Sequence, residues 1–195
     1  PGVYAPAFYE ARYDDAGRFA ALEPLTPDAP RVIRRRIVEE LPPPLVKPIV
    51  PFLQTIHDRA SVEIQRGCTQ GCRFCQAGMI YRPARERTAD TVVQAARDLM
   101  ANTGYDELSL LSLSTTDHSQ IVPMINQLTS TFDDLKVGIP STRVDSFSVD
   151  VANAVAKGKK HTLTLAPEAG SQRLRNAINK LVSEEDLLGA AENAF

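Results

Sequence analysis

The three cysteines of this chain, Cys68, Cys72 and Cys75, all lie in one window of eight residues. Thiolates at this spacing can converge on one metal centre, because soft sulfur ligands favour zinc and iron–sulfur clusters. A cubane 4Fe–4S cluster has four irons, so three protein thiolates leave one iron free to chelate a small molecule. The window therefore predicts a metal centre with one open coordination position.

Two other uses of the same cysteines stay open. A structural zinc site would need a fourth ligand from elsewhere in the chain, for which the candidates are His57, His118 and His161. A disulfide is disfavoured in a chain that we expect in the cytoplasm, where thiols stay reduced. Five arginines and one glutamate in residues 66–87 give a net charge of +4, which offsets the negative charge of thiolates.

The cysteine window directly follows a predicted strand, in a stretch where short β-rich runs alternate with helical spacing of apolar residues. Strands are expected at Val62–Gln65, Leu108–Leu113, Lys136–Ile139 and His161–Leu165. Helices are expected to begin near Thr88, Ile121, Val149, Ser171 and Ser183. This alternation predicts an α/β fold with parallel strands, as in doubly wound sheets and β/α barrels. In both folds ligands bind at the C-terminal ends of the strands, where the cysteines lie.

The start of the chain differs in composition from the rest. Ten of the fourteen prolines lie in residues 1–51, whereas eight of the ten glycines follow residue 60. We therefore expect a proline-rich module over residues 1–55 and a core domain over residues 56–195. Because residue 1 is Pro and the last predicted helix has no terminating signal before Phe195, we expect a piece of a longer protein.

Two elements are predicted within the proline-rich module. Aromatic residues in the extended segment 3–13, a turn at residues 14–17 and a returning segment at residues 18–22 predict a β-hairpin. Apolar residues spaced four apart predict a short helix over residues 31–41. The consecutive prolines that follow, residues 42–44, predict an extended linker.

The overall composition is that of an ordinary folded domain. The chain has 195 residues, of which 43% are hydrophobic and 24% charged, and this composition excludes a disordered tail. Its formal net charge of -2 gives no general attraction to nucleic acid or to an anionic membrane. No apolar run approaches the roughly 18 residues that a membrane-spanning helix needs, and no secretory leader is visible. We expect a cytoplasmic protein.

The spacing Cys68-x-x-x-Cys72-x-x-Cys75, with the aromatic Phe74 just before the last cysteine, resembles the signature of the radical S-adenosylmethionine (SAM) superfamily. Residues 57–83 are similar, more narrowly, to cobalamin-binding-domain-containing radical SAM proteins of uncharacterised substrate. The resemblance implies a partial β/α barrel of six βα units, of which about four are present here. Residues 1–55 would be the connector that follows a cobalamin domain.

The resemblance also implies the cofactors and the chemistry. A 4Fe–4S cluster on the three cysteines would bind SAM through its open iron, and an electron from the cluster would cleave SAM to methionine and a 5′-deoxyadenosyl radical. The residues expected to contact SAM are Phe74, Ser114, Thr115, Arg143, Glu168 and Arg173. Ser114 and Thr115 replace the family's Gly-Gly-Glu-like turn, where Asp117 is either a further contact or a helix cap. Arg175 and Lys180 are expected as exposed charges unless one pairs with the SAM carboxylate.

The implied function is reductive cleavage of SAM with an unknown substrate, coupled to cobalamin-associated methyl transfer or rearrangement. One alternative is a methylthiotransferase-like modification of RNA or of a ribosomal protein. Another is a non-catalytic zinc or iron–sulfur module. The expected partners are a flavodoxin-like or ferredoxin-like reductant and an unknown substrate, and the open edge of the fourth strand offers a site for self-association.

Overall fold

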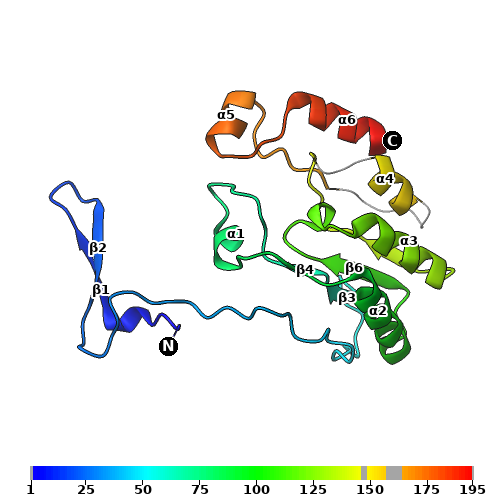
Figure 1. Ribbon diagram of the computed structural model, residues 1–195, viewed down its shortest axis with the longest axis horizontal. Coiled ribbons are helices and arrows are strands. Elements are labelled where there is room, and N and C mark those ends of the chain that lie inside the picture. Colours follow the sequence, from blue (N-terminus) through cyan, green and yellow to red (C-terminus); the bar gives the residue numbers. More distant parts are fainter. Residues whose placement is uncertain (1, 146–148, 157–163, 195) are drawn as a thin grey trace. The chain divides into compact units, whose positions relative to one another are not determined.

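The structure is a computed structural model that describes residues 2–145, 149–156 and 164–194 (Figure 1). Contacts within the chain divide it into two compact units, Pro1–Glu39 and Glu40–Phe195. The boundary expected near residue 55 therefore lies inside the second unit. Within the described ranges, no helix has the length and apolar character needed to cross a membrane.

The first unit is built on the predicted hairpin, which is confirmed. After a short 3-10 helix, η1 (Pro6–Phe8), strand β1 (Tyr9–Tyr13) pairs antiparallel with β2 (Phe19–Pro24). The turn between them is held by the Asp14 side chain, which accepts hydrogen bonds from the backbone N–H groups of Ala16 and Arg18 at 3.0 and 2.9 Å. This is the local bonding that favours Asp in turns.

The helix predicted over residues 31–41 is wrong, because this segment contains no helix. Its apolar residues find little to pack against, since Ile37 and Val38 remain 47% and 56% exposed. Pro30 and the prolines at residues 42–44 prevent extension at either end. An isolated helix shorter than about 12 residues is marginal in water without a surface that covers its apolar face.

The second unit contains a parallel sheet in the order β3-β6-β7, which confirms the predicted α/β class. Its strands are β3 (Ala60–Glu63), β6 (Glu107–Leu111) and β7 (Lys136–Gly138). Of the fourth predicted strand, residues 161–163 lie outside the described residues, and Leu165 forms a single parallel bridge with Thr142. Closure of this sheet into a barrel stays a prediction.

The first strand of the sheet is interrupted just before the cysteines. Ile64 still donates its N–H to the Leu111 carbonyl at 2.9 Å, but its own carbonyl accepts from Arg87 N at 2.8 Å. The next two residues form β4 (Gln65–Arg66), which pairs antiparallel with β5 (Arg85–Glu86). The chain that carries the cysteines thus leaves and returns through one short ribbon.

Helices pack against the sheet and complete the core. Helix α2 (Ala89–Thr103) contacts β3 and helix α3 (Ile121–Thr131), which in turn contacts β7 and α4 (Val149–Ala156) (Figure 1). The core joins apolar side chains of strands and helices, among them Val62, Leu99, Leu110, Ile125 and Val137. Thr88 caps α2, and Gly104 ends it with a φ of 74°, as the sequence predicts.

The two C-terminal helices also begin where their capping residues predict. Ser171 Oγ accepts from Leu174 N at the start of α5 (Gln172–Ala177). At the start of α6 (Glu184–Ala194), Asp186 N donates to Ser183 Oγ at 2.9 Å, and Ser183 N donates to Asp186 Oδ2 at 2.8 Å. This reciprocal pair is the predicted capping box.

Candidate functional site

The cysteine loop, defined here as residues 67–84, is closed at its base by the β4–β5 ribbon. Gly67 begins it with a φ of 86°, a conformation that favours glycine. A Cβ at this position would collide with the Tyr81 carbonyl and come within 2.7 Å of the Pro83 carbonyl. The two ends of the loop can therefore approach each other only with glycine at residue 67.

All three cysteines are free thiols within this loop. Cys68 and Cys72 are buried and Cys75 is half-buried. Cys68 Sγ accepts from Gln70 N at 3.4 Å, and Cys75, the N-cap of the short helix α1 (Gln76–Ile80), accepts from Gly78 N at 3.3 Å. Backbone N–H groups that point at sulfur stabilise negative charge on it, as they do at iron–sulfur clusters.

The described histidines that could complete a zinc site, His57 and His118, make other contacts or face solvent. His118 is buried, with Nε2 3.0 Å from the Arg87 carbonyl and Nδ1 accepting from Gln120 N at 3.0 Å. Both ring nitrogens of His118 are therefore engaged in the protein. His57 is exposed, and His161 lies outside the described residues.

The three free thiols are of the ligand type that binds an iron–sulfur cluster. In the part of the chain that the structure describes, no three Cys, His, Asp or Glu side chains are grouped to hold one metal ion. In a cubane each thiolate binds a different iron, so its ligands need not surround one point. Three unpaired thiols on one loop, with N–H groups directed at two of them, are a donor set that fits a 4Fe–4S cluster.

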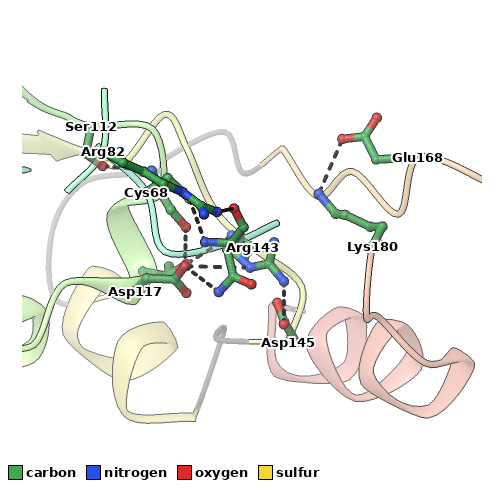
Figure 2. A network of polar contacts seen from close by, with 11 residues as sticks. Cys68, Arg82, Ser112, Asp117, Arg143, Asp145, Glu168 and Lys180 are labelled. Carbon is green, nitrogen blue, oxygen red and sulfur yellow. Dashed lines mark hydrogen bonds and ion pairs between the residues drawn. The ribbon is translucent and has the colours of Figure 1, made fainter. Parts of the chain in front are cut away.

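Asp117 joins the cysteine loop to the loop after β6. Its Oδ2 atom accepts from Gln70 Nε2 at 3.0 Å and from Ser114 Oγ at 2.7 Å. The same atom lies 3.7 Å from Arg143 Nε, and Figure 2 shows this pair close to Cys68. Asp117 thus links three segments that are distant in sequence, in addition to ending the 3-10 helix η2 (Thr115–Asp117).

Arg143 brings a buried positive charge to the same place. Its side chain is 8% exposed and forms an ion pair of 2.5 Å from Nη2 to Asp145 Oδ2. Burial acts to lower the pKa of Arg143, but the hydrogen bond to Asp145 and the charges of Asp145, Asp117 and Cys72 together raise it. Arg143 Nε has no hydrogen-bond partner among the described residues. The guanidinium is therefore charged, buried and close to Cys72.

The hydroxyl groups expected to contact SAM are already used within the protein. Ser114 and Thr115 are 1% and 0% exposed. Ser114 Oγ donates to Asp117, while Thr115 Oγ1 donates to the Leu110 carbonyl at 3.3 Å and lies 3.0 Å from Ser112 Oγ. These contacts hold the turn after β6, which leaves the role of both residues toward SAM a prediction.

Two basic residues that follow the fourth predicted strand, Arg175 and Lys180, are more buried than expected. Glu168 adopts a φ of 69° and accepts from Lys180 Nζ at 3.3 Å. Lys180 and Arg175 are 8% and 4% exposed, so the expectation of exposed helix charges is wrong for both. Arg175 donates to the carbonyls of Val182, Ala169 and Gly170, and so holds the segment around α5 together. Arg173 is exposed on α5.

The end of α5 and the segment after it contact the cysteine loop directly. Arg73 donates its backbone N–H to the Ile178 carbonyl at 2.9 Å and its Nη1 to the Ala177 carbonyl at 2.6 Å. Asn179 Nδ2 donates to the Gly71 carbonyl at 2.8 Å. Sequence reasoning missed these contacts, because residues more than 100 positions apart leave no shared pattern in a single sequence.

Arginines within and beside the cysteine loop make contacts inside the protein. Arg66 binds the Glu63 carboxylate through two hydrogen bonds of 2.7 Å, and Arg87 Nε donates to the Glu63 carbonyl at 2.8 Å. The hydrogen bond from Arg66, with the charges of Arg66 and Arg87, lowers the pKa of Glu63. Arg82 Nη2 donates to the Gln70 carbonyl at 2.6 Å.

A cavity of about 470 Å³ opens beside the start of the cysteine loop. It is lined by Glu63, Gln65, Arg66, Gly67, Tyr81, Leu111, Ser112 and Leu113. Gln65 is 4% exposed, and its Oε1 atom has no hydrogen-bond partner among the described residues. The cavity lies at the C-terminal ends of β3 and β6, where parallel α/β folds bind ligands.

Comparison with known proteins gives related sequences and related structures. The model of the radical SAM superfamily matches residues 62–195. Uncharacterized protein MJ0966 of Methanocaldococcus jannaschii is 38% identical over 135 residues, which cover 68% of this chain and 29% of that protein. The ribosomal protein uS12 methylthiotransferase RimO of Prochlorococcus marinus is 29% identical over 110 residues, which cover 55% of this chain and 24% of that protein.

Among solved structures, the radical SAM methyltransferase TsrM from Kitasatospora setae, with cobalamin and a 4Fe–4S cluster bound, matches with a TM-score of 0.56. The match covers 70% of this chain and 29% of that chain at 14% identity, and it supports the fold. The chain spans less than a third of the length of each of these relatives. With a family match over more than half of its residues, the chain belongs to the radical SAM superfamily, whose members are enzymes that use a 4Fe–4S cluster and SAM.

Proposed function

We propose that the protein binds a 4Fe–4S cluster on Cys68, Cys72 and Cys75 and cleaves SAM reductively, with methionine and a 5′-deoxyadenosyl radical as the products. The observation that carries the proposal is the set of three free thiols on one loop at the C-terminal end of a parallel sheet. Three ligands for four irons leave one coordination position for SAM. The family match over residues 62–195 supports the same assignment.

The bound cluster would supply the electron that breaks the carbon–sulfur bond of SAM. The protein's own residues hold and polarise the site. Gln70 N and Gly78 N stabilise charge on two thiolates, and the buried guanidinium of Arg143 offsets charge near Cys72. Asp117 contacts both Arg143 and Gln70 and so joins Arg143 to the cysteine loop.

The SAM contacts are proposed on the same geometry. Phe74 is 55% exposed beside Cys75, which leaves its ring accessible to an adenine. The N–H group at Arg143 Nε has no hydrogen-bond acceptor among the described residues, and it is proposed to donate to SAM. The further proposed contacts are Ser114, Thr115, Glu168 and Arg173. The cavity beside Gln65 is the proposed place for the substrate, and a flavodoxin-like or ferredoxin-like protein is the proposed reductant.

Two coupled reactions are candidates. Cobalamin-associated methyl transfer or rearrangement is supported by the residues that resemble cobalamin-linked radical SAM proteins and by the fold match to TsrM. In that case residues 1–55 would be the connector from a cobalamin domain. Methylthio transfer to RNA or to a ribosomal protein is supported by the 29% identity to RimO. The reductive cleavage of SAM is common to both.

The test is anaerobic reconstitution of the intact protein with iron and sulfide, followed by SAM and dithionite. We expect about four irons per chain, an electron paramagnetic resonance (EPR) signal of a reduced cluster that changes when SAM is added, and formation of 5′-deoxyadenosine. Cys72→Ala should abolish all three while the far-UV circular dichroism stays unchanged. Thr69→Ala, an exposed residue of the same loop, is the matched control and should behave as the wild type.

Other results would overturn the proposal. One zinc per chain without an iron–sulfur chromophore or SAM binding would identify a structural metal site. Unfolding of Cys72→Ala would indicate the same, because a structural metal contributes directly to folding.

A further inference from the structure

The cysteine loop is held by the last residue of α5 and the short segment that follows it. Two hydrogen bonds join Arg73 to the carbonyls of Ala177 and Ile178, and a third joins Asn179 Nδ2 to the Gly71 carbonyl at 2.8 Å. Gly71 and Arg73 flank Cys72 on both sides. The segment therefore fixes the backbone immediately before and after the central cysteine.

The Asn179–Gly71 contact depends on the types of both residues. Asn179 has a φ of 56°, and Asn is one of the few residues other than Gly that adopt this conformation readily. A Cβ at residue 71 would lie 2.8 Å from Asn179 Nδ2. Glycine at residue 71 thus leaves the space that the amide occupies, and both residues are shielded from solvent in part.

Other contacts of the cysteine loop hold Gln70, two residues before Cys72. Gln70 is fixed through its side chain by Asp117 and through its carbonyl by Arg82. The contacts of Arg73 use carbonyls of the partner segment, so no side chain can be removed from that segment to release them. Within the partner segment, Asn179 is the residue whose side chain holds the loop next to Cys72.

From these contacts we propose that Asn179 is a positioning residue for the iron–sulfur cluster. Its amide holds the Gly71 carbonyl and thereby sets the direction in which Cys72 presents its thiolate. The proposal rests on the proposed function, since it assumes that Cys72 binds iron. It also couples the segment that carries Glu168 and Lys180 to the cysteine loop.

The test compares two replacements that both tolerate the backbone conformation. Asn179→Gly keeps a φ of 56° accessible and removes the amide, while Asn179→Asp keeps the shape and removes the N–H donor. In the intact reconstituted protein, we expect Asn179→Gly to weaken iron retention against a chelator about fivefold, the effect of one lost hydrogen bond. Asn179→Asp should weaken it at least as much, because its carboxylate would face the Gly71 carbonyl. We also expect altered EPR g values of the reduced cluster, which a purely structural role would not produce.

Two controls sharpen the result. Asn176→Asp keeps the acceptor that Gln172 uses and lies three residues away on α5, so it should retain iron as the wild type does. Gly71→Ala should weaken retention on its own, because its methyl group would displace Asn179. In the Asn179→Gly background the same change should cost little more, since the clash is gone.

The outcomes separate the two proposals. A wild-type protein that loads no cluster would contradict the proposed function itself. A loaded wild type with Asn179 variants of equal retention and identical g values would overturn the positioning role, as would additive effects in the double variant. Loss of the fold together with the cluster in Asn179→Asp would show a structural role instead and would also overturn it.

Discussion

Single residues near the cysteines carry charges that the fold buries. Arg143 lies between two carboxylates and close to Cys72, and the balance of their effects raises its pKa. Arg175 and Lys180 are buried as well, each with its hydrogen bonds made to carbonyls or to Glu168. Buried charges of this kind are stable only when they are paired. The site therefore contains fixed positive charge that solvent does not screen.

Arg143→Met should lower the midpoint potential of the reconstituted cluster. Reduction adds a negative charge to the cluster. In the wild type the positive guanidinium of Arg143 stabilises this charge, and the variant lacks it. A tenfold change in the reduction equilibrium corresponds to about 59 mV for one electron, and we expect a shift of about this size in an EPR-monitored redox titration. Arg97→Met, at an exposed position of α2, should leave the potential unchanged. Equal potentials in the two variants would contradict the argument.

Among the elements, the switch from the sheet to the β4–β5 ribbon places the cysteine loop. Ile64 donates the last hydrogen bond to β6, and the chain then pairs with β5 instead. Glu63, at the end of β3, binds Arg66 of β4 and lies near Arg87 beyond β5. An ion pair thus joins the sheet, the ribbon and the segment that leads into α2.

Glu63→Gln should destabilise the protein by about 1 kcal/mol at pH 7, a modest effect because this side chain is one-third exposed. The folded state lowers the pKa of Glu63 below its ordinary value of 4.5. Its contribution is therefore present above that pH and is lost as the pH falls through the lowered value. Free energies of unfolding, measured in urea for the wild type and for Glu63→Gln, should become equal at acid pH. Glu185→Gln, at an exposed position of α6, should match the wild type at every pH.

At the scale of the whole molecule, the two units differ in how many buried apolar residues they contain. The buried apolar residues of the described chain lie in the second unit, from Ala60 to Ala190. The first unit, which contains the hairpin, has many exposed apolar side chains, such as Phe19 and Val32. The stability of the second unit therefore rests on its own packing between the sheet and the helices.

Removal of residues 1–39 should leave the thermal unfolding of the remaining chain nearly unchanged. We expect a shift in Tm of less than about 2 °C, because no described core residue is lost. Leu110→Ala, by contrast, removes a fully buried side chain of β6 and should cost about 2 to 5 kcal/mol. A fall in Tm after the deletion as large as that from Leu110→Ala would show that the hairpin supports the core.

Local patterns in the sequence were sufficient to predict much of the secondary structure of this protein and the position of its candidate metal centre. The three cysteines, the alternation of strands and helices, the hairpin turn at Asp14 and the caps at Thr88 and Ser183 each depend on a few neighbouring residues. Such features are set by backbone preferences and short hydrogen bonds within the segment. They fixed the fold class and the place of the candidate metal centre.

Tertiary structure decided the rest. It left residues 31–41 without a helix, buried Arg175 and Lys180, and placed Asn179 against Gly71 and Arg143 near Cys72. Whether a charge is buried or a helix is stable depends on partners supplied by distant segments, and these partners leave no periodic signal in one sequence. The cysteines alone mark the centre, whereas the groups that hold and charge it come together only when the chain folds.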